Sequence, residues 1–152
     1  MKDHDNNKKT LYEFLKEHPA AHLATVNPDG KPFISTVYFY ANSMAELFIA
    51  TLSKTEKYKN IQADSHVALV VTDEDAQKTV QITGTASEEQ NPAVKMAILE
   101  QLATLQARNK SGWPPPIVKL DKGQLRLIKV IPTWVRLSDF KNPENVIQFE
   151  TT

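Results

Sequence analysis

The sequence predicts a mainly β fold: an antiparallel barrel of six to seven strands with a few helices. Several short runs are rich in β-branched and aromatic residues, and short connections join most neighbouring runs, which favours antiparallel pairing. Three other segments place apolar residues at helical spacing. A barrel is favoured over an open sheet because closure leaves few strand edges exposed.

One helix is predicted near the start of the chain. Residues 1–9 are polar and are expected to be frayed or disordered. Residues 10–18 place apolar side chains at helical spacing, and Thr10 is the expected N-cap. Pro19 is expected to end this helix because the residue before a proline avoids the helical conformation.

Seven runs have the composition of strands. They cover residues 21–26, 33–40, 47–52, 67–72, 79–86, 125–131 and 133–137. The first two flank Asn27–Gly30, where proline at the second position and glycine at the fourth fit a type I turn, so they form a predicted hairpin. Pro132 separates the last two runs and indicates an edge or a corner of the barrel.

Two further helices are predicted from their capping residues. Ser53 and Glu56 have the spacing of a capping box, which predicts a short helix that ends near Asp64. Asn91 as N-cap and proline at the first helical position predict a longer helix, which runs to about Arg108. Its predicted apolar stripe consists of Val94, Ala97, Ile98, Leu102 and Leu105.

Length and composition favour one cytoplasmic domain, residues 1–152, with 141–152 as a tail. Lys+Arg and Asp+Glu both total 18, so the basic excess of a nucleic-acid-binding protein is absent, and the balance is compatible with self-association. The chain has no cysteine, which excludes disulfides and thiolate chemistry. No apolar run reaches the roughly 20 residues that span a bilayer, and no secretory leader is visible.

The sequence shows no metal site and no recognisable catalytic triad. The four histidines lack the paired spacing of metal ligands, so no metal is expected. No nucleophile elbow or serine–histidine–acid order is present. Two tryptophans allow more than one interpretation: Trp113 roofs a pocket or packs at a dimer contact, and Trp134, on a strand, is more often a core residue.

The strongest local chemistry lies in Ser53–Lys57, where a strand meets the N-terminus of a helix. The unpaired first-turn N–H groups and the helix dipole favour an anion there. Ser53 and Thr55 offer hydroxyl groups, and Lys54 and Lys57 offer positive charge, so the segment is a candidate phosphate site. The alternative interpretation is that Ser53 only caps the helix and that the lysines are solvated.

Several pieces of the chain resemble, in order and spacing, the flavin-binding core of the pyridoxamine 5′-phosphate oxidase-like split barrels. The matching pieces are Leu23–Pro32, Leu47–Thr51, Lys57–Ile61 and Val80–Ala86. The resemblance covers nearly the whole chain when the last two strands are included. It implies an FMN-binding split barrel, with small general stress proteins among the similar members.

The resemblance also implies which residues meet the cofactor. The backbone of Ser35, Thr36 and Val37 matches the strand that lies along the flavin ring. Ala50 and Thr51 match residues that reach the flavin and its ribityl chain. Lys57 matches the second member of a basic pair that holds the phosphate, with Ser53 or Lys54 as further contacts. The first member of that pair matches Glu56, and a carboxylate there would repel phosphate.

The family's cofactor lies between two subunits, so the resemblance implies a homodimer. Gln81 matches a position from which the partner contributes a polar contact, although an outward-facing strand residue explains it equally well. Three functions stay open: an FMN-dependent oxidoreductase with an unknown small-molecule substrate, a non-catalytic flavin- or haem-binding or stress-related module, and a cofactor-free interaction protein. F420 is a further alternative to FMN.

Overall fold

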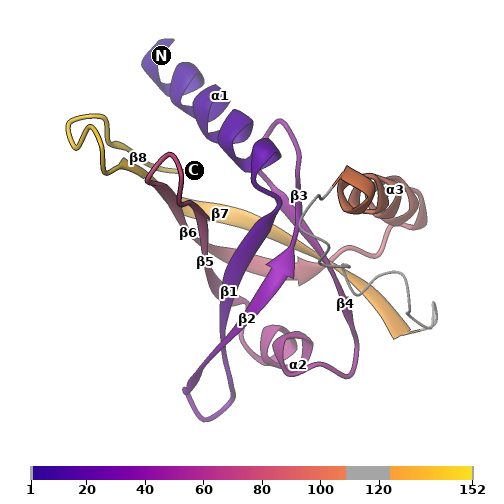
Figure 1. Cartoon of the computed structure of the whole chain (residues 1–152). Helices are drawn as coiled ribbons and strands as arrows, with labels where there is room; N and C mark the ends of the chain where they lie inside the picture. Colours follow the sequence, from indigo (N-terminus) through magenta and orange to yellow (C-terminus); the bar gives the residue numbers. More distant parts are fainter. Residues whose placement is uncertain (1, 109–123, 152) are drawn as a thin grey trace.

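The computed structural model describes residues 2–108 and 124–151, and the predicted roles of Trp113 and of the loop around it lie outside these residues. The helices are α1 (Lys2–Glu17), α2 (Glu56–Ala63) and α3 (Pro92–Arg108). The strands are β1 (Ala20–Val26), β2 (Pro32–Tyr38), β3 (Tyr40–Ala41), β4 (Leu47–Leu52), β5 (His66–Asp73), β6 (Lys78–Glu88), β7 (Leu125–Asp139) and β8 (Ile147–Glu150). Figure 1 shows their arrangement.

Within the described residues, eight antiparallel strands form one sheet that curls into a half-barrel (Figure 1). The strand order is β2-β1-β5-β6-β7-β4-β3, and β8 pairs with the second half of β7. The predicted mainly β, antiparallel split-barrel fold is confirmed. The predicted strand 33–40 is two strands, because β2 pairs with β1 whereas β3 pairs with β4, and with β8 the count exceeds the predicted six or seven. β8 lies in the segment that was expected to be only a tail.

The two strands predicted on either side of Pro132 are one continuous strand, β7. Thr83 pairs with Trp134 and the next residue, Gly84, pairs with Pro132, so Thr133 is an extra residue in a bulge. Proline cannot donate to a β ladder, and a bulge is one of the places where a strand accepts it. Gly84 fits the same bend because a Cβ atom there would press against the carbonyl oxygen of Ile131.

The first helix begins earlier than predicted. α1 starts at Lys2, so residues before Thr10 are helical rather than disordered, and Thr10 lies inside the helix instead of capping it. The Thr10 hydroxyl donates to the carbonyl of Asn6, one turn back (3.0 Å). Asp3 and Asp5 lie in the first turn, where negative side chains stabilise the positive end of the helix dipole. The residues before Thr10 therefore form a helix although they lack apolar side chains at helical spacing.

The capping prediction for α3 and the hairpin prediction are confirmed. Asn91 accepts hydrogen bonds from the N–H groups of Ala93 (3.0 Å) and Val94 (3.3 Å), and the helix begins at Pro92. The Gly30 N–H donates to the Asn27 carbonyl (2.9 Å) between β1 and β2, and Gly30 has a positive φ of 77°. Glycine accepts this conformation without strain.

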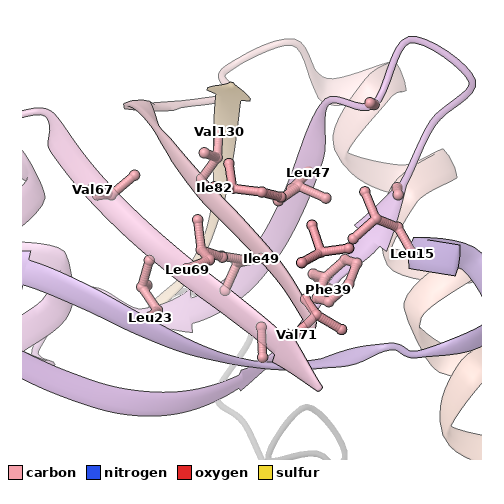
Figure 2. Packing of buried hydrophobic residues seen from close by; sticks show 14 of the residues in the cluster. Leu15, Leu23, Phe39, Leu47, Ile49, Val67, Leu69, Val71, Ile82 and Val130 are labelled. Atoms are coloured by element: carbon pink, nitrogen blue, oxygen red, sulfur yellow. The ribbon is translucent and has the colours of Figure 1, made fainter. Parts of the chain in front are cut away.

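The core lies inside the curved sheet and is closed at one end by α1. Figure 2 shows Leu23, Ile49, Leu69, Ile82 and Val130 packing toward one another from five different strands. A second, smaller cluster lies on the outer side of the sheet, where α3 packs on β4 and β7; its buried members are Phe48, Leu102 and Leu127. The outer faces of β1, β2, β5 and β6 are not part of this second cluster.

Candidate functional site

The turn between β4 and α2 places a helix N-terminus at the end of the barrel. Thr55, not Ser53, is the N-cap: its hydroxyl accepts from the Tyr58 N–H (3.4 Å) and donates to the Leu52 carbonyl (2.9 Å). The Thr55 hydroxyl also lies 3.0 Å from that of Thr51, an inward-facing residue at the end of β4. The predicted capping box was wrong because this second hydroxyl and the Leu52 carbonyl favour capping two residues later.

Ser53 and Lys54 lie in the turn before the cap rather than in the helix. The Ser53 N–H donates to the carbonyl of Gln124 (2.9 Å), which ties this turn to the start of β7. Ser53 is half-buried, and Lys54 is exposed. Both residues therefore remain next to the helix N-terminus, as predicted.

The charged side chains in the first turn of α2 differ in their exposure and in their ion pairs. Glu56 and Lys59 form an exposed ion pair (3.2 Å). Lys57 is half-buried, and burial lowers the pKa of its ammonium group below the ordinary lysine value. Within the described residues, no carboxylate forms an ion pair with Lys57. This lysine is a partly desolvated cation whose charge an anion would stabilise.

Side-chain hydrogen bonds fix α2 to the strands beneath it. The Asn60 amide donates to the Thr25 hydroxyl of β1 (3.0 Å), and both residues are buried. The Tyr58 hydroxyl donates to Glu88 of β6 (2.8 Å), and this hydrogen bond and burial raise the pKa of the Tyr58 phenol. Glu88 also pairs with Arg126 of β7 (3.4 Å). Two strands, β1 and β6, thus hold the helix directly, and β7 supports the second contact through Glu88.

The predicted residues of β2 point in two directions. Ser35 and Val37 pair with Leu23 and Ala21 of β1 and face the barrel interior, where Val37 is buried. The Ser35 hydroxyl oxygen is buried and has no hydrogen-bond partner within the described residues. Thr36 faces outward and is exposed. β2 ends the strand order, so its outer backbone edge pairs with no strand in the described part of the chain.

β2 contacts both β4 and α2, so Ser35, Thr51 and Lys57 belong to neighbouring elements. We call this place the α2 corner: β2, the end of β4, the following turn and the first turn of α2. Ala50 differs from its neighbour, because its side chain packs in the cluster under α3 and only its backbone borders the corner. Most of the predicted site residues therefore lie on the elements of the α2 corner.

Gln81 does not share this place. It is exposed on the outer face of β6, where its register partners are Val70 on β5 and Arg136 on β7. Trp134 is half-buried on the same outer face, beside Thr83, and does not belong to the barrel core. An outward Gln81 meets a cofactor only if a second molecule covers this face.

Glu88 of β6 and Arg126 of β7 are polar residues bordering the α2 corner that sequence reasoning missed. Each is far from α2 in the sequence, and only the sheet register brings them together: Arg126 pairs with Thr51, and Glu88 pairs with Ile128. No local motif marks either residue.

The described helices include none long and apolar enough to cross a membrane.

Comparisons with known proteins agree on the fold. The family model described as pyridoxamine 5′-phosphate oxidase matches residues 8–139. No curated protein matches the sequence. The fold is similar to that of a NimC/NimA family protein from Clostridium acetobutylicum, with a TM-score of 0.72, 18% identity, and coverage of 97% of this chain and 94% of that one.

Two other solved structures are similar at low identity. One is a Clostridium acetobutylicum protein related to general stress protein 26, of the pyridoxinephosphate oxidase family: TM-score 0.70, 11% identity, 96% of this chain and 95% of that one. The other is HutZ, the haem storage protein of Vibrio cholerae: TM-score 0.63, 21% identity, 81% of this chain and 87% of that one. At these identities the similarity shows a shared fold and gives no information about the ligand.

Proposed function

Because this chain belongs to the pyridoxamine 5′-phosphate oxidase family, we propose that it is an FMN-binding flavoprotein, an oxidoreductase that acts on a small molecule. The phosphate of FMN would bind at the first turn of α2, and the flavin ring would lie along the open edge of β2. When bound, FMN supplies the hydride and electron transfer, and the protein supplies binding, orientation and electrostatics.

The observation that carries this proposal is the environment of Lys57. Its half-buried ammonium group lies in the first turn of a helix, and no carboxylate pairs with it in the described part of the chain. Burial without a counter-charge disfavours a cation, whereas a bound anion restores the balance. The positive end of the helix dipole in the same turn favours an anion independently.

Glu56, the departure from the family's basic pair, does not remove the anion site. Its carboxylate forms an exposed ion pair with Lys59, which partly neutralises its charge. The Thr51 hydroxyl contacts that of Thr55, and Ser53 and Lys54 lie in the turn before the helix. This turn therefore offers hydroxyl, backbone and ammonium donors to a phosphate. The backbones of Ser35, Thr36, Val37 and Ala50 are the proposed contacts of the ring and ribityl chain.

A titration with two flavins tests the cofactor. FMN fluorescence is expected to be quenched on binding, and riboflavin, which lacks the phosphate, is expected to bind more weakly. Lys57→Gln is expected to weaken FMN binding by about tenfold or more, because a hydrogen bond to a charged group is lost. Lys16→Gln, on the exposed side of α1, is the matched control. Equal affinities of wild-type protein for FMN and riboflavin would contradict the proposal.

We also propose that the protein is a homodimer joined through the outer face of the sheet. We call this surface the open face. It consists of two neighbouring cross-strand rows: Thr36, His22, Val70, Gln81 and Arg136; and Ile34, Ala24, Ala68, Thr83 and Trp134. Ile34 is 67% exposed, and the alanines permit a close approach of a second sheet. A second copy on this face would bring its Gln81 toward the first copy's cofactor.

Sedimentation tests the dimer. Ala68→Arg inserts a large charged side chain in the middle of the open face, so it is expected to convert a dimer into a monomer at micromolar concentration. Met96→Arg introduces the same side chain on the exposed side of α3 and is the control. A monomeric wild-type protein, or an Ala68→Arg variant with unchanged mass in solution, contradicts this assembly.

Haem is the second candidate cofactor, favoured by the similarity to the haem storage protein HutZ. The absorption spectrum of the freshly purified protein distinguishes the two, because haem gives an intense Soret band and flavin gives the broader bands of a yellow protein. A Soret band without flavin would replace the FMN proposal with haem binding. A protein that binds neither FMN nor haem, or that binds F420 instead, would also overturn the FMN proposal.

A further inference from the structure

The α2 corner has fewer well-placed positive charges than a phosphate monoester has negative charges. A phosphate monoester carries about −1.5 to −2 charges near neutral pH, and Lys57 supplies one positive charge. The other nearby lysines are less suited to supply the second: Lys59 is paired with Glu56, and Lys54 is exposed to water on the turn. A cation from another part of the chain would balance the second charge of the phosphate.

Arg126 has the right position on the neighbouring strand. It is the direct register partner of Thr51, so both side chains project from the same face of the sheet at the end of β4. Its Nε lies 3.4 Å from Oε1 of Glu88, whose other oxygen accepts a hydrogen bond from Tyr58 in the first turn of α2. Glu88 thus connects the guanidinium of Arg126, through Tyr58, to the turn that carries Lys57.

The contact between Arg126 and Glu88 is suited to exchange. A short charge-assisted N–H···O bond measures about 2.7–2.9 Å, and the observed 3.4 Å is longer. The Arg126 side chain keeps 31% of its surface exposed, so a ligand can reach it. Guanidinium also binds phosphate in a bidentate manner, which lysine cannot do.

The buried Ser35 hydroxyl is independent evidence for a polar ligand near this place. Its oxygen has no hydrogen-bond partner in the described residues, although it faces the interior from β2, the strand that contacts β4 and α2. A buried hydroxyl without a partner is costly. A bound ligand would supply the missing hydrogen bond.

We propose that Arg126 is the second cation of the phosphate site, and that Glu88 holds its guanidinium in place until the phosphate binds. This inference depends on the proposed FMN function, which it extends by assigning a specificity-determining residue on β7. The predicted preference is for a doubly charged phosphate monoester over the same molecule without its phosphate.

Parallel titrations of FMN and riboflavin test the inference. Arg126→Gln is expected to weaken FMN binding by about tenfold or more and to leave riboflavin binding within twofold of the wild type. Glu88→Gln is expected to tighten FMN binding, because the carboxylate that competes with phosphate for Arg126 loses its charge. Lys129→Gln is the matched control, since it removes a cation and an ion pair, with Glu46 (3.0 Å), from the same strand.

The outcomes separate this inference from the function on which it depends. If Lys57→Gln weakens FMN binding and Arg126→Gln does not, Arg126 has no role in the site and the FMN proposal stands. If Arg126→Gln also lowers riboflavin affinity, the residue acts through the fold rather than through the phosphate, and the inference is wrong. The Glu88→Gln/Arg126→Gln double variant guards against misfolding, because it leaves no half-buried carboxylate without its cation. It too is expected to lose only FMN affinity.

Discussion

The side chains of His18 and Asp73 join the end of α1 to the end of β5: imidazole Nε2 lies 2.8 Å from carboxylate Oδ2. The other ring nitrogen, Nδ1, lies 2.7 Å from the carbonyl of Phe14, whose ring stacks on the imidazole at 4.3 Å between centroids. One ring nitrogen thus contacts a carbonyl of the helix, and the other contacts a carboxylate of the sheet. His18 therefore links the helix to the barrel through two hydrogen bonds.

The first prediction concerns pH. The Ala76 N–H (2.8 Å), and after it His18, hold the pKa of Asp73 below its ordinary value of 3.8, although partial burial opposes them. A lowered folded-state pKa stabilises the fold above the ordinary value, and the effect is lost as the pH falls through the lowered pKa. Asp73→Asn is thus expected to be less stable than wild type at neutral pH, with a difference that shrinks in acid.

Thermal unfolding followed by circular dichroism over a pH series measures this difference. Asp29→Asn, in the exposed turn between β1 and β2, is the control and is expected to follow the wild type at every pH. A constant gap between Asp73→Asn and wild type from neutral to acidic pH would show that the Asp73 charge contributes nothing.

The second prediction concerns the Thr55 cap. Thr55→Ala removes the acceptor of the Tyr58 N–H and the contact with Thr51, and it is expected to cost about 1 kcal/mol of unfolding free energy. It should also weaken FMN binding, because the helix N-terminus would fray. Thr104→Ala, whose hydroxyl donates only to its own helix at Glu100, is the control. Unchanged stability in Thr55→Ala would argue against this cap.

The third prediction concerns the buried pair Asn60 and Thr25. Asn60→Leu leaves the Thr25 hydroxyl buried without a partner, so we expect a loss of about 1–3 kcal/mol in denaturant unfolding. The double variant Thr25→Val/Asn60→Leu removes both polar groups and is expected to recover part of that loss. A double variant that is as unstable as the sum of the two single variants would mean that the pair is not coupled.

The fourth prediction concerns the bulge of β7. Gly84→Ala forces a methyl group against the Ile131 backbone, so the strands must shift, with an expected cost of about 1–3 kcal/mol or more. Gly30→Asn is the comparison, because nothing lies within 4 Å of a Cβ there and asparagine tolerates a positive φ. If the urea midpoints of unfolding fall equally for both variants, crowding by the Ile131 backbone is not the reason for glycine at position 84.

Local patterns in the sequence predicted local structure well. Asn91 followed by proline identified the start of α3, and Asn27–Gly30 identified the hairpin, because capping and turn chemistry act within a few residues. The same reasoning failed at Ser53, where a hydroxyl from β4 and a carbonyl acceptor moved the cap to Thr55. It also failed at Lys2, where polar residues without an apolar stripe are helical.

The amino-acid sequence was thus sufficient for the fold class, for most strands and for Lys57 at a helix N-terminus. It was not sufficient for the partners of that lysine. Arg126 lies opposite Thr51, and Glu88 lies under Tyr58, because β7 pairs with both β4 and β6. Strand register depends on side-chain packing across the whole sheet, and no local pattern records which distant residues it brings together.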